Sequence, residues 1–303
     1  MAVSTPQRSA QRAVSGLATR RRSSTPKERL FAWLVFAATI VGVIVLAVLL
    51  ADVLIDGSPR LSWQFVTSYA SRFPEKTGVL AGIASSFSLM VLVMLIAFPL
   101  GLGAAVYLEE FAPDNRFTRL MEANISNLAG VPSVVYGLLG LSIFVYLLQM
   151  GRSLIAGALT LSLLILPVII VAARESMRAV PRAIRDGGLA LGATGWQTVS
   201  RQVIPAALPG ILTGTILGLS RAIGETAPLL VVGALIGQRG STMPWEIFDR
   251  VSALPIEVYG LISRPQAGFR EEAAPAGIIV LLVILLLMNS VAIVVRNRYA
   301  RSS

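Results

Sequence analysis

Two side chains of opposite charge, Arg221 and Glu225, lie inside a long apolar stretch, four residues apart. That spacing puts both on one face of a helix. A guanidinium offers forked donors that match phosphate oxygens, and a neighbouring carboxylate tempers the attraction so that a bound anion can leave. A charge at the centre of a bilayer costs about 2.5 to 3.5 kcal/mol, so both must face protein or water. The two residues indicate an anion contact within a membrane, with a structural ion pair as the alternative.

A second polar interruption occurs in the run NLAGVPSVVYGLLGLSIFV, which contains Gly130 and Pro132 near its start. Proline removes a backbone donor and breaks or kinks a helix. One interpretation is a kinked membrane helix, which is common. The other is that freed backbone groups near Ser133 and Tyr136 line a path for a polar solute.

The sequence contains no cysteine and no histidine. This excludes disulfides, thiol nucleophiles, histidine bases and the usual transition-metal ligands. Neither Lys27 nor Lys76 lies in a G-x-x-x-x-G-K-[ST] loop for nucleotide phosphates. We therefore expect no metal site, no cofactor and no covalent catalysis, and any nucleotide energy has to come from a partner.

Long apolar runs must position these residues. Of the 303 residues, 55% are hydrophobic and 14% charged, with a mean hydropathy of +0.74, whereas soluble proteins carry about 25% charged residues. About 20 apolar residues span a bilayer, and six runs qualify: 31–54, 79–107, 128–149, 153–173, 204–237 and 275–295. They are too continuous for barrel strands, and backbone pairing in lipid favours helices. The predicted fold class is an all-α membrane protein with six transmembrane helices.

The basic residues are unevenly distributed between the two sides of this topology. With the N-terminus inside, seventeen Lys and Arg residues fall in cytosolic segments and eight in external ones, out of 26. The positive-inside rule then places both termini in the cytosol, and this distribution argues against nucleic acid as the reason for the net charge of +10. The polar, Arg-rich segment 1–29 is expected to be a disordered cytosolic tail, although its composition also resembles a transit peptide.

The segment 186–209, DGGLALGATGWQTVSRQVIPAALP, lies between two apolar runs and has a helical pattern of its own. Pro181 suits the first turn of a helix, and Gly192 is a good position for a turn between two short helices. The pattern predicts a helix-turn-helix on the cytosolic membrane surface. It either docks a partner or only braces its neighbours, as interfacial helices often do.

This segment resembles the cytosolic "EAA" loop of ABC importer permeases. Asp186 stands at the acid, Gly187 and Gly188 at the two small residues, and Gly192 at the characteristic glycine, followed by the Ile204-Pro205 and Leu208-Pro209 exit. Asp in place of Glu and the two glycines in place of alanines are departures from the pattern. The resemblance implies that an ATPase is contacted by the coupling residues Asp186, Gly187, Gly188, Ala190, Gly192 and Ala193.

Two further runs, NLAGVPSVVYGLLGLSIFV and SRAIGETAPLLVVGA, resemble the phosphate-import branch of these permeases, and Ala227-Pro228-Leu229 resembles its PstA type. The resemblance implies the type I permease fold over 78–295, with a first transmembrane helix and external loop at 30–77 and a cytosolic tail at 296–303. It implies a bacterial plasma membrane location, phosphate as substrate, and three partners: a homologous PstC-type permease, a cytosolic ABC ATPase dimer and an external phosphate-binding protein. It assigns substrate translocation to Arg221, Glu225, Thr226, Ser133 and Tyr136.

Three other functions stay open from the residues. An ion-coupled secondary anion transporter would use Arg221 and Glu225 as its coupling pair and would need no ATPase. A membrane sensor or scaffold would bind regulators through its tail and loop. Within the same family, the substrate could be another oxyanion, molybdate or sulfate.

Overall fold

The computed structural model describes residues 26–234 and 245–300. Residues 1–25 of the expected tail 1–29 therefore lie outside the described residues. The chain divides into two compact units, Met1–Asp52 and Val53–Ser303. Residues 26–52 of helix α2 (Pro26–Gly57) are the described part of the first unit. The 32 residues of α2, at 1.5 Å each, reach about 48 Å and exceed the roughly 30 Å hydrocarbon core.

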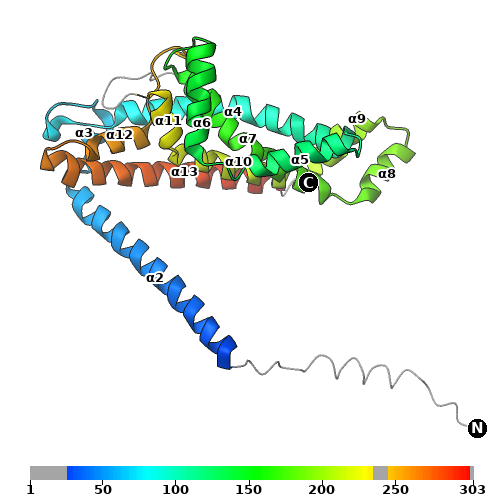
Figure 1. The fold of residues 1–303 in the computed structure, drawn as a ribbon, viewed down its shortest axis with the longest axis horizontal. Helices are drawn as coiled ribbons and strands as arrows, with labels where there is room; N and C mark the ends of the chain where they lie inside the picture. Colours follow the sequence, from blue (N-terminus) through cyan, green and yellow to red (C-terminus); the bar gives the residue numbers. More distant parts are fainter. Residues whose placement is uncertain (1–25, 235–244, 301–303) are drawn as a thin grey trace, which may run out of the picture. The chain divides into compact units, whose positions relative to one another are not determined.

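The second unit consists almost entirely of helices (Figure 1). Its longer members are α4, α7, α10 and α13, and several α-helices continue directly into π-helical turns. In chain order the elements are η1 (Ser58–Arg60), α3 (Trp63–Thr67), η2 (Pro74–Lys76), α4 (Leu80–Val106), η3 (Tyr107–Phe111), α5 (Arg116–Leu128), α6 (Ser133–Gly140), η4 (Leu141–Leu147), α7 (Leu154–Arg178), α8 (Arg182–Ala190), α9 (Gly195–Thr198), η5 (Val199–Val203), α10 (Ile204–Gly224), α11 (Ala227–Val232), α12 (Leu254–Ile262), η6 (Gly268–Ala273) and α13 (Ala274–Ala300).

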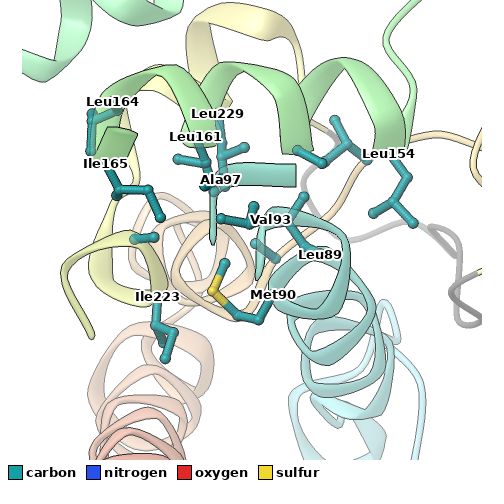
Figure 2. Close-up of a cluster of buried hydrophobic side chains, with 14 of the residues drawn as sticks. Leu89, Met90, Val93, Ala97, Leu154, Leu161, Leu164, Ile165, Ile223 and Leu229 are labelled. Atoms are coloured by element: carbon teal, nitrogen blue, oxygen red, sulfur yellow. The ribbon is translucent and has the colours of Figure 1, made fainter. Parts of the chain in front are cut away.

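The main core lies between α4, α7 and α10, with α11 closing one side. Figure 2 shows Val93 of α4, Leu161 of α7 and Ile223 of α10 among its side chains, all of them buried. Small residues let these helices approach closely, as expected of the second apolar run. A side chain on Gly101 of α4, for example, would lie 2.7 Å from Ile169 of α7.

Five of the described helices are long and apolar enough to cross a membrane: Pro26–Arg60, Leu80–Phe111, Leu154–Arg178, Gly195–Gly224 and Gly268–Arg298. A sixth span arises if α5 and the helix Ser133–Leu147, bent by 105° at the break between them, count as one. The expected interruption of the run 128–149 at Gly130 and Pro132 is thus a sharp bend, larger than a kink within one helix. The physical reason is the proline, which cannot donate a helical hydrogen bond.

The fifth expected helix, 204–237, also differs from the structure. It begins earlier, because α9, η5 and α10 form one helix of 30 residues, Gly195–Gly224. It ends earlier as well, at Gly224, and a separate short helix, α11, follows. Figure 1 shows α8 and α9 at one end of the bundle and α3 and α12 at the other. The helix Gly195–Gly224 therefore runs from the end that carries α8 into the core.

Candidate translocation and coupling sites

Arg221 and Glu225 form an ion pair at the point where α10 ends. The Nε atom of Arg221 donates to Oε1 of Glu225 at 3.3 Å, and the two side chains are 42% and 17% exposed. The pair was expected on one continuous helical face, but Glu225 lies in the break, with φ −78° and ψ 117°. Thr226, the next residue, is the N-cap of α11. The predicted charges therefore meet, and they do so beside an interrupted backbone.

Sequence explains this interruption locally. Pro228 occupies one of the first two positions of α11, where its missing amide proton costs nothing but where it cannot continue α10. The amide of Glu225 bonds to the carbonyl of Ala222 at 3.3 Å, which tightens the last turn. Gly233, with φ 95°, then ends α11 in a left-handed conformation that favours glycine.

Helix α6 packs directly against this break. A side chain on Gly137 would lie 2.7 Å from Cα of Pro228 and 3.0 Å from its carbonyl oxygen. The two interrupted segments are thus neighbours. Tyr136 is buried, and its hydroxyl donates to the carbonyl of Leu128 at 2.8 Å. That bond holds the end of α5 against α6, while Ser133, at the start of α6, is half-buried.

The ion pair lies level with the middle of the bundle. Ser220, next to Arg221, pairs with the side chain of Asn289, and Asn289 lies near the midpoint of α13 (Ala274–Ala300). A charge among apolar helices of membrane-spanning length is costly unless it faces protein or water.

The segment that resembles a coupling loop is a helix-turn-helix, as predicted. Pro181 precedes α8, and Gly192 turns the chain with φ 83°. Thr194 and Gln197 then form a capping box that starts α9. The departures from the family pattern do not prevent helix formation, since α8 includes Asp186, Gly187 and Gly188.

Most of α8 is exposed, which bears on whether it only braces the bundle. Leu189 is 53% exposed and Leu191, just after the helix, is 89% exposed. Asp186, Gly187 and Ala190 are also exposed, Ala193 is half-buried and Gly188 is buried. The rest of the chain does not cover these leucines, so this surface is open either to a partner or to the membrane surface.

Acidic and basic residues at the same end of the bundle form a network that the sequence did not predict. Nη2 of Arg174 lies 3.2 Å from Glu109 and 2.6 Å from Glu122, and Arg178 also reaches Glu109, at 2.9 Å. A separate pair joins Arg185 of α8 to Glu110 at 2.7 Å, and hydrogen bonding to that carboxylate raises the pKa of Arg185. The only sequence signal was the presence of acids and arginines directly after apolar runs.

A buried carboxyl group was also missed. Glu257 of α12 is 3% exposed, and its Oε1 has no hydrogen-bond partner among the described residues. Burial raises its pKa to about 7, against the opposing effects of Arg264 and a hydrogen bond with Ser252. Because α12 lies outside the long apolar helices, nothing in its spacing distinguished this residue.

The helical arrangement is the fold of type I permeases of ABC importers. The structure aligns with a TM-score of 0.61 to a crystal structure of a bacterial alginate ABC transporter in complex with an alginate pentasaccharide-bound periplasmic protein, at 16% identity, covering 88% of this chain and 94% of that chain. That likeness concerns the fold alone.

The chain belongs to the family of binding-protein-dependent transport system inner membrane components, whose model matches residues 97–301. It is 33% identical to the probable ABC transporter permease protein YqgI of Bacillus subtilis (strain 168), over 85% of this chain and 89% of that protein. It is 31% identical to the phosphate transport system permease protein PstA of Haemophilus influenzae (strain ATCC 51907 / DSM 11121 / KW20 / Rd), over 85% of this chain and 90% of that protein. The family resemblance and the fold class inferred from the sequence are thereby confirmed, and the chain is a multi-span permease of the inner membrane.

Proposed function

We propose that this chain is the PstA-like membrane subunit of an ATP-driven phosphate importer. It pairs with a homologous PstC-type permease, receives phosphate from an external binding protein and is driven by a cytosolic ABC ATPase dimer. Both termini and α8 lie in the cytosol, as the distribution of Lys and Arg favours. The observation that carries the proposal is a half-exposed Arg221 paired with Glu225 at a helix break, in a chain related to proteins named PstA.

Arg221 is suited to a reversible phosphate contact. Its Nε donates to Glu225, while its two terminal nitrogens donate no hydrogen bond to any described residue. Those nitrogens can bind two phosphate oxygens in parallel. Glu225 weakens the net attraction, so the anion is not held permanently, and its carboxylate can accept a hydrogen bond from a protonated phosphate oxygen. Fully ionised sulfate cannot offer that proton, which favours phosphate.

The neighbouring polar groups complete the proposed path. Thr226 and Ser133 offer hydroxyls on either side of the contact between α11 and α6. Tyr136 uses its proton on the carbonyl of Leu128 in this structure, so it donates to phosphate only when the bend between α5 and α6 opens. Substrate passage and movement of that bend are therefore linked in the proposal. The subunit itself carries out no covalent chemistry.

Energy enters through α8 and the turn at Gly192. The helix Gly195–Gly224 continues from that turn to the ion pair, and its 30 residues cover about 45 Å. The exposed residues Asp186, Gly187 and Ala190 contact the ATPase, while Gly188, Gly192 and Ala193 shape the segment that presents them. Nucleotide-driven movement of the ATPase then reaches Arg221 through one continuous helix.

Uptake into proteoliposomes that contain all four proteins tests this function. We expect radiolabelled phosphate to accumulate only with internal ATP and the loaded binding protein, with little competition from sulfate or molybdate. Accumulation driven by a proton or sodium gradient without ATP would indicate a secondary transporter instead. Equal competition by sulfate or molybdate would assign another oxyanion to the same fold.

A further inference from the structure

Helix α8 is most closely covered by the rest of the chain at two residues. Within Arg182–Ala190, Gly188 is buried and Arg185 is half-buried, while the remaining residues are exposed. A displacement of the helix is transmitted through the positions at which it packs most closely. What each of them contacts therefore determines which parts of the bundle follow α8.

The first contact leads to α10. A side chain on Gly188 would lie 2.9 Å from Oγ1 of Thr198 and 2.8 Å from Oε1 of Gln202. Both neighbours belong to the helix Gly195–Gly224, which carries Arg221. This contact repeats the route that the chain already takes through the turn at Gly192.

The second contact leads to a different helix. Nη2 of Arg185 donates to Oε1 of Glu110 at 2.7 Å, and its Nε lies 3.2 Å from the other carboxylate oxygen. The same guanidinium donates to the carbonyls of Val180 at 2.7 Å and Met177 at 2.8 Å, at the end of α7. Glu110 is 8% exposed and lies in η3, which continues α4. The Arg185 side chain of α8 thus forms hydrogen bonds at the ends of both α4 and α7.

The end of α4 is in turn tied to its neighbours. Glu109, adjacent to Glu110, accepts hydrogen bonds from Arg174 and Arg178 of α7. Arg174 also donates to Glu122 of α5 at 2.6 Å. Because α5 leads into the bend before α6, a displacement of Glu110 is transmitted to α6, which packs against Pro228.

We infer that Arg185 and Glu110 form a second coupling route, which carries movement of α8 to α4, α7 and α5 while the turn at Gly192 carries it to α10. Both are positioning residues, since neither touches the substrate. The inference rests on the proposed function, because it presupposes that an ATPase moves α8. Movement of α8 then reaches α10, which carries Arg221, and α6, which packs on Pro228 through Gly137, by separate connections.

The first test compares uptake with ATP hydrolysis in proteoliposomes that contain the full transporter. The Arg185→Gln and Glu110→Gln variants should still co-purify with the ATPase. Their phosphate imported per ATP hydrolysed should fall by a factor of about five or more. The double variant should be no worse than either single one, because both remove the same connection. Glu271→Gln is the control: Glu271 is 61% exposed and pairs only with its neighbour Arg270 among the described residues, away from the charged network, so its ratio should stay native.

A native uptake ratio in both single variants overturns the inference, as does a double variant whose loss equals the product of the single losses. If a variant does not assemble, spin labels on the otherwise native chain decide. The chain has no cysteine, so Ala183→Cys on α8 and Asp114→Cys after η3 accept labels selectively. Their separation should be the same in the nucleotide-free and ATP-bound transporter, and a shift between those states overturns the inference.

These outcomes are separate from failure of the proposed function. If the native transporter imports no phosphate, or imports it without ATP, the proposed function is wrong. The second route is wrong by itself when the native transporter imports phosphate with ATP and the variants keep its uptake ratio.

Discussion

Replacement of Gly188 by alanine should loosen the docking helix, although alanine favours helices. The added methyl group would lie 2.8 Å from Oε1 of Gln202, 2.9 Å from Oγ1 of Thr198 and 3.0 Å from Cγ2 of Thr198. Gln202 can move the end of its side chain, but Thr198 is buried and has little room. Overpacking of this kind costs about 1 to 3 kcal/mol.

Part of that cost is offset by the higher helix propensity of alanine, about 1 kcal/mol. The net loss is therefore about 0 to 2 kcal/mol, with an upper limit that corresponds to a roughly 30-fold shift of α8 away from its docked position. Gly187→Ala is the matched control, because a side chain there meets nothing within 4 Å. It gains the propensity term alone, and α8 should become more stable by about 1 kcal/mol.

Hydrogen exchange of the α8 amides in nanodiscs measures both effects. Protection should rise in Gly187→Ala and fall in Gly188→Ala, because only the second substitution meets neighbouring atoms. Adding Thr198→Ala to Gly188→Ala removes Oγ1 and Cγ2 of Thr198, which lie 2.9 and 3.0 Å from the added methyl group, and should restore protection. Equal protection in the two single variants would refute the close packing of Gly188, and a double variant without recovery would refute Thr198 as its cause.

Three further predictions concern other positions. Gly192→Ala forces a side chain into the left-handed region at φ 83°, which costs about 1 to 2 kcal/mol; ATPase stimulation should fall, while Gly195→Ala, in open space, should behave as native. Gly137→Ala would place a methyl group 2.7 Å from the backbone of α11, so both the thermal midpoint and uptake should fall, whereas Gly103→Ala, also in open space, should retain both. Glu257 has its pKa raised from 4.5 to about 7, so its ionisation destabilises the folded state progressively between those values and fully above pH 7. Glu257→Gln should therefore raise the free energy of unfolding at pH 8 by at most about 3 kcal/mol, with a higher thermal midpoint, and leave both unchanged at pH 4. An equal gain at both pH values would show that ionisation is not the cause.

Long helices were predictable because their signal is local. The apolar runs that became α4, α7 and α13 are each long enough to span a membrane. The turn at Gly192 was predictable for the same reason, since glycine readily adopts its positive φ. These features depend on residues that are near one another in the sequence.

The break at Glu225 was harder to predict, although Gly224 and Pro228 are both visible in the sequence. A proline within a membrane helix often produces only a kink, as α4 and α7 show by continuing through Pro99 and Pro167. What accompanies a full break here is the close approach of Gly137, on a helix distant in the sequence.

The charged network was beyond local patterns as well. Glu110 and Arg185 are 75 positions apart, and Glu109 and Arg174 are 65 apart. A single sequence shows that each charge follows an apolar run but not which charges meet. Glu257 is a similar case, because only the packing of α12 against α4 and α13 makes its carboxyl group buried.

The initial rate of ATP-driven phosphate uptake by an Arg221→Gln transporter tests the central claim most directly. Loss of a charged hydrogen-bond donor costs about 1.5 to 3 kcal/mol, so the rate should fall roughly ten- to hundred-fold. Arg221→Lys, which keeps the charge but not the fork, should fall between that variant and the native protein. Arg270→Gln, at a pair that is more than half exposed near the start of α13, should keep the native rate. A native rate in Arg221→Gln would contradict the account, because the ion pair would then have no part in moving phosphate.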